Sequence, residues 1–238
     1  MRTKEQIIKE LSEFYFGDEA RNYDSMRNSS PTAKKLIGLQ KKALRRLLKN
    51  IRGKKILDVA CGTGFFFSEY GKNKIYGIDI SEEMLKIAKK IKNPHVVSLK
   101  KADATRIPFE DGFFDVVITS KFIMHTPDYM NVFGEMARVT KKRGIIIADL
   151  PNKYSISYIF TGLRIESGKI RYYNFFSNQE IRNICSSFGL SVVGREGTTV
   201  LSHRPLPESM FPIIDNINKI KPVINKFSYV YYTKFRKL

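Results

Sequence analysis

The chain has 238 residues, of which 42% are apolar and 27% are charged, a composition typical of a globular protein rather than a disordered one. This length suits one α/β domain, and no apolar run approaches the roughly 20 residues that a membrane-spanning helix requires. The formal net charge of +19 would attract anionic partners such as nucleic acid, acidic lipid headgroups or phosphorylated substrates, although general lysine enrichment accounts for it equally well.

Residues 1–10 mix lysine and glutamate with isoleucine and lack the apolar stretch of a secretory signal, so a cytoplasmic location is expected. The two cysteines, Cys61 and Cys185, are far apart and form no CxxC or Cys/His cluster. That spacing fits neither a disulfide framework nor a zinc site, and we expect two reduced thiols and no metal.

Amphipathic helices are predicted at 4–16 and 32–50 from the helical spacing of their apolar residues. The second helix lies in a basic stretch without acids, whose cations are Lys34, Lys35, Lys41, Lys42, Arg45, Arg46, Lys49, Arg52, Lys54 and Lys55. The C-terminal tail repeats the pattern with Lys219, Lys221, Lys226, Lys234, Arg236 and Lys237. These two segments are the candidate contact surface for RNA or for an acidic membrane.

Strands and helices alternate in the middle of the chain. Strands are predicted at 55–59, 74–78, 95–99, 115–119 and 145–149, with helices at 82–91 and 128–140. Ser81, followed by Glu82 and Glu83, is a candidate helix N-cap. This alternation predicts a parallel sheet with helices on both faces, and ligands of such sheets bind beyond the carboxyl ends of the strands.

A glycine-containing loop follows the first predicted strand. It reads Asp58-Val-Ala-Cys-Gly62-Thr-Gly64, and its glycines allow a tight turn and a close approach of a ligand to the backbone. Phe67 stands where a dinucleotide-binding loop would carry its third glycine, and no Gly-Lys-Ser/Thr follows as in a P-loop. The loop therefore favours a nucleoside ligand without a pyrophosphate.

Two further acids follow the next two strands. Asp79 ends the second strand, where a carboxylate can accept hydrogen bonds from both ribose hydroxyls. Asp103 follows the third strand, where it could accept from an exocyclic adenine amine.

Together these motifs resemble class I S-adenosylmethionine-dependent methyltransferases, most closely the subgroup that acts on small molecules and quinone-type lipids. The resemblance rests on ILDVACGTG, GIDISEEML, KADATRIPFEDGFFDVVITS and EMARVTKKRGIIIADL, in order within 54–150. Weaker likenesses at 173–193 and 229–237 correspond to the sixth helix and strand and to an antiparallel last strand. The resemblance implies an α/β Rossmann-like fold with a mostly parallel seven-stranded sheet and helices on both faces.

The same resemblance implies one methyltransferase domain over 1–238. Residues 1–53 would form an N-terminal helical cap, 54–150 the cofactor-binding core, and 151–238 the acceptor-side insert and the C-terminal strands.

The resemblance also implies S-adenosyl-L-methionine as the cofactor and S-adenosyl-L-homocysteine as its product. Asp58, Gly62 and Gly64 would hold the methionine portion, and Asp79 the ribose. Ile80 and Met84 would lie against the adenine, with Asp103 and Ala104 at its amino edge. Ala60, Ser120 and Tyr23 complete the candidate cofactor residues, where Tyr23 resembles a segment that folds over the cofactor and is equally compatible with a solvated loop.

Methyl transfer needs alignment of acceptor and methyl group, and it needs a base only if the acceptor carries a proton. His125, just past the fourth strand, is the candidate general base, and the alternative is a histidine that shapes the loop. Thr119-Ser-Lys-Phe122 lacks the Asn/Asp-Pro-Pro-aromatic motif of exocyclic base-amine methyltransferases and the nucleophilic cysteine of cytosine-5 enzymes.

Aromatic residues are concentrated at 151–176, together with cations, and this region is the candidate acceptor wall; ordinary core packing would explain about half of its rings. The primary hypothesis is a methyltransferase for a small-molecule or lipid-like acceptor. An RNA (tRNA or rRNA) methyltransferase that uses the basic surface is the first alternative. A non-catalytic S-adenosylmethionine-binding protein is the second.

Overall fold

The computed structural model describes residues 6, 30–155, 158, 172–199, 209, 211–220, 224 and 226–238. Tyr23, nearly all of the predicted helix at 4–16 and much of the aromatic stretch at 151–176 lie outside these residues.

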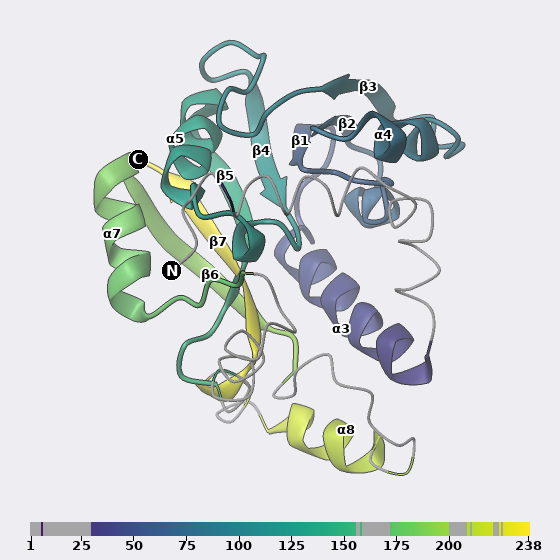
Figure 1. Cartoon of the computed structure of the whole chain (residues 1–238), viewed down its shortest axis with the longest axis vertical. Helices are drawn as coiled ribbons and strands as arrows, with labels where there is room; N and C mark the ends of the chain where they lie inside the picture. The colour runs from purple at the N-terminus through teal and green to yellow at the C-terminus, as the bar shows by residue number, and fades with distance from the viewer. Residues whose placement is uncertain are drawn as a thin grey trace.

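The described residues build a seven-stranded sheet in the order β3-β2-β1-β4-β5-β7-β6 (Figure 1). The strands are β1 Lys55–Val59, β2 Lys74–Asp79, β3 Val96–Lys101, β4 Phe114–Thr119, β5 Thr140–Pro151, β6 Leu190–Gly197 and β7 Val230–Lys237. The first five strands pair in parallel, and β7 runs antiparallel between β5 and β6. The predicted fold, including the antiparallel last strand, is confirmed.

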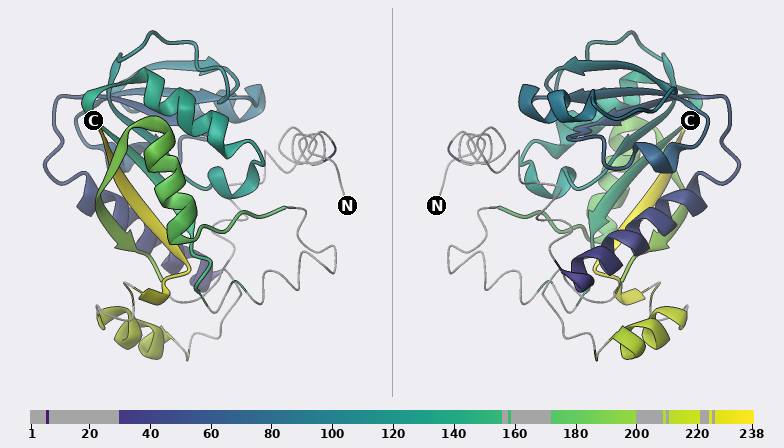
Figure 2. Two further views of the ribbon diagram at one scale, coloured as in Figure 1. Left: turned by 90° about the vertical axis from the view of Figure 1, so that its left-hand side faces the viewer. Right: turned by 90° about the vertical axis from the view of Figure 1, so that its right-hand side faces the viewer.

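The described helices and 3₁₀ turns are α3 Pro31–Leu47, η1 Phe67–Tyr70, α4 Glu82–Ala88, η2 Ile123–His125, α5 Tyr129–Val139, α7 Asn178–Phe188 and α8 Phe211–Lys219. α5 and α7 pack on one face of the sheet, and α3, η1 and α4 pack on the other. Alternate strand residues divide the core: Leu57 and Val117 pack with α5 and α7, whereas Ile56 and Val116 pack with α3, η1 and α4. Figure 2 shows the sheet between these two layers.

Several element ends differ from the prediction by a few residues, most clearly the start of β5 and the end of α4. β5 begins at Thr140, ahead of the apolar run, because the backbone of Thr140 pairs with Phe114 beside a register shift and does not require an apolar side chain. α4 ends at Ala88 rather than at residue 91, since its buried face stops there and Ile91 is exposed. The predicted N-cap is confirmed, because the Ser81 hydroxyl accepts from the Met84 amide at 3.3 Å.

The sheet order positions the site. The chain crosses from β3 over β2 and β1 to β4, so β1 and β4 are neighbours whose connections leave in opposite directions. Val59 of β1 is level with both Ile78 of β2 and Thr119 of β4, so three strands end side by side. No helix in the described part of the chain is long and apolar enough to cross a bilayer.

Arg138 of α5 ties down the segment between β3 and β4. Its guanidinium donates to the carbonyl oxygens of Ile107 (2.8 Å) and Phe109 (2.9 Å) and to the carboxylates of Glu135 (2.7 and 2.8 Å) and Asp111 (2.8 Å). The hydrogen bonds from Arg138 hold the pKa of Glu135 below its ordinary value.

Replacing Arg138 by methionine should lower the free energy of unfolding by about 1–3 kcal/mol, because the two carbonyls lose their donors. Urea denaturation followed by circular dichroism measures this. The matched control is Arg182→Met, since the Arg182 guanidinium bonds one exposed glutamine. Equal losses in the two variants would contradict the special role of Arg138.

Candidate active site

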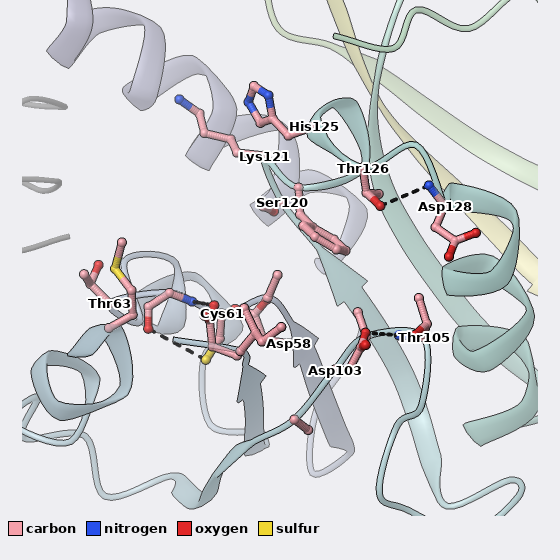
Figure 3. A pocket seen from close by; sticks show the side chains of 18 of the residues that line it. Asp58, Cys61, Thr63, Asp103, Thr105, Ser120, Lys121, His125, Thr126 and Asp128 are labelled. Carbon is pink, nitrogen blue, oxygen red and sulfur yellow. Dashed lines mark hydrogen bonds between the residues drawn. The ribbon is translucent and has the colours of Figure 1, made fainter. Parts of the chain in front are cut away.

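A cavity of about 250 Å³ lies beyond the carboxyl ends of β1, β2 and β4 (Figure 3). Its walls come from the loops that follow these strands and from the segment after β3. The lining residues are Asp58, Ala60, Cys61, Gly62, Thr63, Phe66, Asp79, Ile80, Met84, Ala102, Asp103, Ala104, Thr105, Ser120, Lys121, Phe122, His125, Thr126, Pro127 and Asp128. This set contains all the predicted site residues except Gly64 and Tyr23.

The bend after β1 has the left-handed backbone that its glycines permit. Ala60, Gly62 and Gly64 have φ angles of 58°, 55° and 76°. A Cβ on Gly62 would meet nothing within 4 Å, so this glycine leaves open space at the cavity wall. A Cβ on Gly64 would lie 2.6 Å from the Phe67 ring, so Gly64 is required for packing behind the bend rather than for lining the cavity.

Asp79 joins the ends of β1 and β2. Its carboxylate accepts from the Gly62 amide at 2.7 Å and from the Ser81 amide at 2.9 Å. Burial raises the pKa of Asp79, and these backbone hydrogen bonds partly oppose that rise. Because Asp79 also lines the cavity, it presents a fixed acceptor where a ligand hydroxyl could donate.

Asp58 is held from behind by a tyrosine. The Tyr70 hydroxyl donates to the Asp58 carboxylate at 2.6 Å, and both side chains are buried. Burial and the Asp58 charge raise the pKa of Tyr70 well above its usual range, so the phenol stays protonated and remains a donor. Tyr70 was not predicted as part of the site, since only its place within an aromatic-rich turn could have indicated it.

Cys61 lines the cavity as a neutral thiol. Burial and the charges of Asp58 and Asp79 raise its pKa well above the ordinary value. The thiolate required for nucleophilic attack is therefore suppressed.

The segments after β2 and β3 form the opposite wall. Met84 is buried, Ile80 is exposed at the cavity, and the two supply apolar surface. Asp103 accepts from the Thr105 amide at 2.8 Å, which fixes the turn that places Ala104 in the lining. An apolar shelf with a carboxylate at its edge can hold a flat base that carries an amine.

The loop after β4 is anchored by a second buried acid. Lys121 has a φ of 60°, and its amide donates to both carboxylate oxygens of Asp149 on β5, at 2.8 and 2.9 Å. The preceding residue, Ser120, accepts from the Tyr232 hydroxyl at 3.3 Å. Neither Asp149 nor Tyr232 was predicted; a buried acid at the end of the apolar strand IIIADL was the available signal for Asp149.

His125 ends η2 and lines the cavity near Lys121 (Figure 3). The His125 ring packs edge to face against the Tyr173 ring, with the ring centroids 5.3 Å apart. Asn174 fixes the surrounding backbone: its amide donates to the Met124 carbonyl (2.7 Å), and its Nδ2 donates to the carbonyls of Ile123 (3.0 Å) and Thr126 (2.6 Å).

The described rings of the predicted acceptor wall lie outside the cavity lining. Phe176 is buried in the core against Tyr129, as the packing alternative expected. Tyr173 and Phe175 form a second group behind His125, where Tyr173 accepts from the Tyr229 hydroxyl at 2.6 Å. These rings brace the His125 loop. Phe160, Arg164, Lys169 and Arg171 lie outside the described residues.

Residues 57–148 match a family model described as a methyltransferase domain. The demethylmenaquinone methyltransferase of Geobacillus stearothermophilus is 37% identical over 141 residues, which cover 56% of this chain and 59% of that protein. The corresponding protein of Lactococcus lactis is 32% identical over 154 residues, covering 61% of this chain and 59% of its own length. The chain thus spans about three fifths of the length of these two relatives.

Solved structures extend the likeness over the fold. Magnesium protoporphyrin IX methyltransferase from Synechocystis PCC 6803, with bound SAH, has a TM-score of 0.69 at 14% identity and covers 98% of this chain and 100% of its own. A methyltransferase from Mesorhizobium loti has a TM-score of 0.61 at 15% identity, covering 82% and 96%. The chain therefore has the class I methyltransferase fold, and within it residues 57–148 match the methyltransferase domain model.

Proposed function

We propose that the chain is an S-adenosylmethionine-dependent methyltransferase that acts on a small-molecule or lipid-like acceptor by in-line displacement. One observation carries the proposal: a single cavity joins the open Gly62 bend and the Asp79 carboxylate to the loop that bears His125. The residues proposed for the nucleoside and the candidate proton acceptor thus line the same cavity.

The residues fit this cofactor. Asp79 would accept from the ribose hydroxyls, since its orientation is already fixed by two backbone amides. Ile80 and Met84 would contact the adenine, and Asp103 and Ala104 would meet its amino edge. The remaining candidates, Asp58, Ala60, Gly62, Gly64, Ser120 and Tyr23, would hold or cover the methionine portion, with Gly64 acting through the shape of the bend.

When bound, the cofactor supplies an electrophilic methyl group on a sulfonium, whose sulfur keeps the electron pair of the broken C–S bond. The protein aligns the acceptor with that methyl group and excludes water. Where the acceptor is a hydroxyl, an amine or an acidic carbon, the His125 imidazole would take its proton. Asn174 and Tyr173 would orient that imidazole without touching the acceptor.

A quinone-type acceptor is the leading choice within this class, because two relatives above 30% identity are named demethylmenaquinone methyltransferases. We assign the cofactor to 54–150 and the acceptor side to 151–238, with 1–53 as a cap and the whole of 1–238 as one domain. The free thiols Cys61 and Cys185 support a cytoplasmic location.

Incubating the protein with methyl-labelled cofactor and a demethylated naphthoquinone kept in its reduced, hydroquinone form tests the acceptor, because the reduced ring carbon is the nucleophile. Cell extract separated into lipid, RNA, protein and soluble fractions is the wider search. We expect label in the quinone and in the lipid fraction. Label confined to RNA would show that the acceptor is RNA rather than a small molecule or lipid. The absence of label from every fraction would favour a non-catalytic S-adenosylmethionine-binding protein.

Replacing Asp79 by asparagine should weaken S-adenosylhomocysteine binding about 10- to 100-fold, since a hydrogen bond to a charged group contributes roughly 1.5–3 kcal/mol. Wild-type affinity should also fall as the pH drops through the raised pKa of Asp79, because the protonated acid is a poorer acceptor. Titration calorimetry at several pH values measures both effects. Glu82→Gln, which alters an exposed ion pair nearby, is the control; equal weakening there would count against a ribose contact.

Replacing Asn174 by alanine removes the donors to the Ile123 and Thr126 carbonyls and should lower kcat about tenfold or more through misplacement of His125. S-adenosylhomocysteine affinity should stay unchanged. His125→Gln should lower kcat about 100-fold and abolish the loss of kcat/KM that protonation of a general base causes at acidic pH. Rates across pH, with the exposed Asn183→Ala as control, check this; an unchanged pH profile in His125→Gln would refute the base.

A further inference from the structure

We propose that the surface around α8 docks on an anionic lipid bilayer and brings the active-site loop to a lipid-borne acceptor. This deepens the proposed function and rests on its lipid-like acceptor. We call this surface the docking patch: the apolar side chains of Tyr154, Ile213, Ile220 and Phe227 with the lysines Lys153, Lys219 and Lys226.

Large apolar side chains are exposed on each segment of the docking patch. Tyr154 is 57% exposed, Ile213 55%, Ile220 50% and Phe227 38%. They come from the turn after β5, from α8 and its end, and from the approach to β7. Figure 1 shows α8 standing apart from the sheet, on the side where β7 begins. Exposed aromatic and isoleucine side chains are groups that can enter the headgroup region of a bilayer.

Hydrogen bonds join these segments into one surface. Asn152 accepts from the Tyr154 amide at 3.0 Å and donates to the carbonyls of Lys226 (3.2 Å) and Ser228 (3.1 Å). The Ile224 amide donates to the Ile220 carbonyl at 3.1 Å, which links this segment to the end of α8. The patch is therefore anchored to β5 and β7 at their shared end.

The charges of the docking patch indicate an anionic partner. Lys153, Lys219 and Lys226 are exposed, while Asp215 is the one acid in the sequence of 151–155, 211–220 and 226–228. Lysines that surround apolar side chains complement anionic headgroups above a hydrocarbon layer. A protein partner would not need this arrangement, and RNA would not need the isoleucines.

The basic helix α3 lacks the apolar part. Its large apolar side chains Leu36, Ile37, Leu44 and Leu47 are buried. Its cations are partly neutralised, because Lys41 and Arg45 pair with Glu69, at 3.4 and 3.3 Å, and Arg46 pairs with Glu196 at 3.2 Å. α3 thus adds attraction at a distance, whereas the docking patch can insert.

The patch is connected to the catalytic loop. The Asn174 side chain donates hydrogen bonds to the loop at 123–126. Phe176 lies two residues further along the chain, and its amide donates to the Pro151 carbonyl at 2.7 Å. Lys153 in turn donates its amide to the Phe176 carbonyl at 3.2 Å. The docking patch and the loop that bears His125 are therefore held in one hydrogen-bonded framework.

The chain contains no tryptophan, so a single one reports its own surroundings. Ile220→Trp places it in the docking patch; Val97→Trp on β3 and Val192→Trp on β6 are matched exposed controls. Each variant is mixed with vesicles of phosphatidylglycerol and phosphatidylcholine, or of phosphatidylcholine alone. We expect a blue-shifted emission and quenching by brominated lipid for Ile220→Trp with anionic vesicles, and unchanged emission for both controls.

Replacing Lys219 and Lys226 by glutamine should weaken anionic-vesicle binding about thirtyfold, and replacing the exposed Lys86 and Lys90 should not. Unchanged emission of Ile220→Trp, equal shifts in the controls, or a response to tRNA but not to vesicles would overturn the proposal. S-adenosylhomocysteine binding by the wild-type protein and by the same variants is measured separately. If the wild-type protein does not bind S-adenosylhomocysteine, the proposed function is refuted, whereas the vesicle-binding result remains valid.

Discussion

The hydrogen bonds from the Gly62 and Ser81 amides to the Asp79 carboxylate hold together the side of the cavity where we propose that the cofactor binds. Burying a carboxylate is costly unless its oxygens are hydrogen-bonded, and here the backbone supplies the donors. Since one donor comes from the β1 bend and the other from the N-cap of α4, a single side chain fixes both loops. The acceptor for a ligand hydroxyl is thus set before any ligand arrives.

The loop after β4, on the side where we propose that the acceptor binds, is fixed in the same way. Asp149 receives the Lys121 amide with both oxygens, and Lys121, like Gly62, has a left-handed backbone. The two turns differ in the residue that adopts the left-handed backbone. At Gly62 the missing Cβ leaves room for a ligand, whereas at Lys121 a side chain is kept and the strain of its φ is offset by the bidentate contact. One turn is therefore suited to backbone contact with a ligand and the other to presenting side chains.

Local patterns predicted which residues at the ends of β1 and β2 line the cavity. Asp58, Gly62 and Asp79 stand at strand ends, and strand ends follow from apolar runs that neighbouring parallel strands bury. The acceptor half depends on contacts between distant segments, such as Asn174 with the carbonyls at 123–126 and Tyr232 with Ser120. No periodicity or turn signal encodes such a pairing. For the same reason the aromatic residues near 175 predicted a wall of the cavity, while their described members brace its loop from behind.

The volume of the cavity limits how much of an acceptor it could enclose. A volume of about 250 Å³ lies just below the roughly 300–1,000 Å³ typical of small-molecule sites, so the cavity would not enclose a cofactor together with a long apolar tail. An acceptor with a long apolar tail could then place only its reacting ring beside His125, and the tail would have to continue outside. The hydrogen-bonded path from the 123–126 loop through Phe176 to Lys153 leads to exposed apolar side chains flanked by lysines. A small cavity next to such a surface is an arrangement in which the membrane, rather than the protein, would solvate the rest of the acceptor.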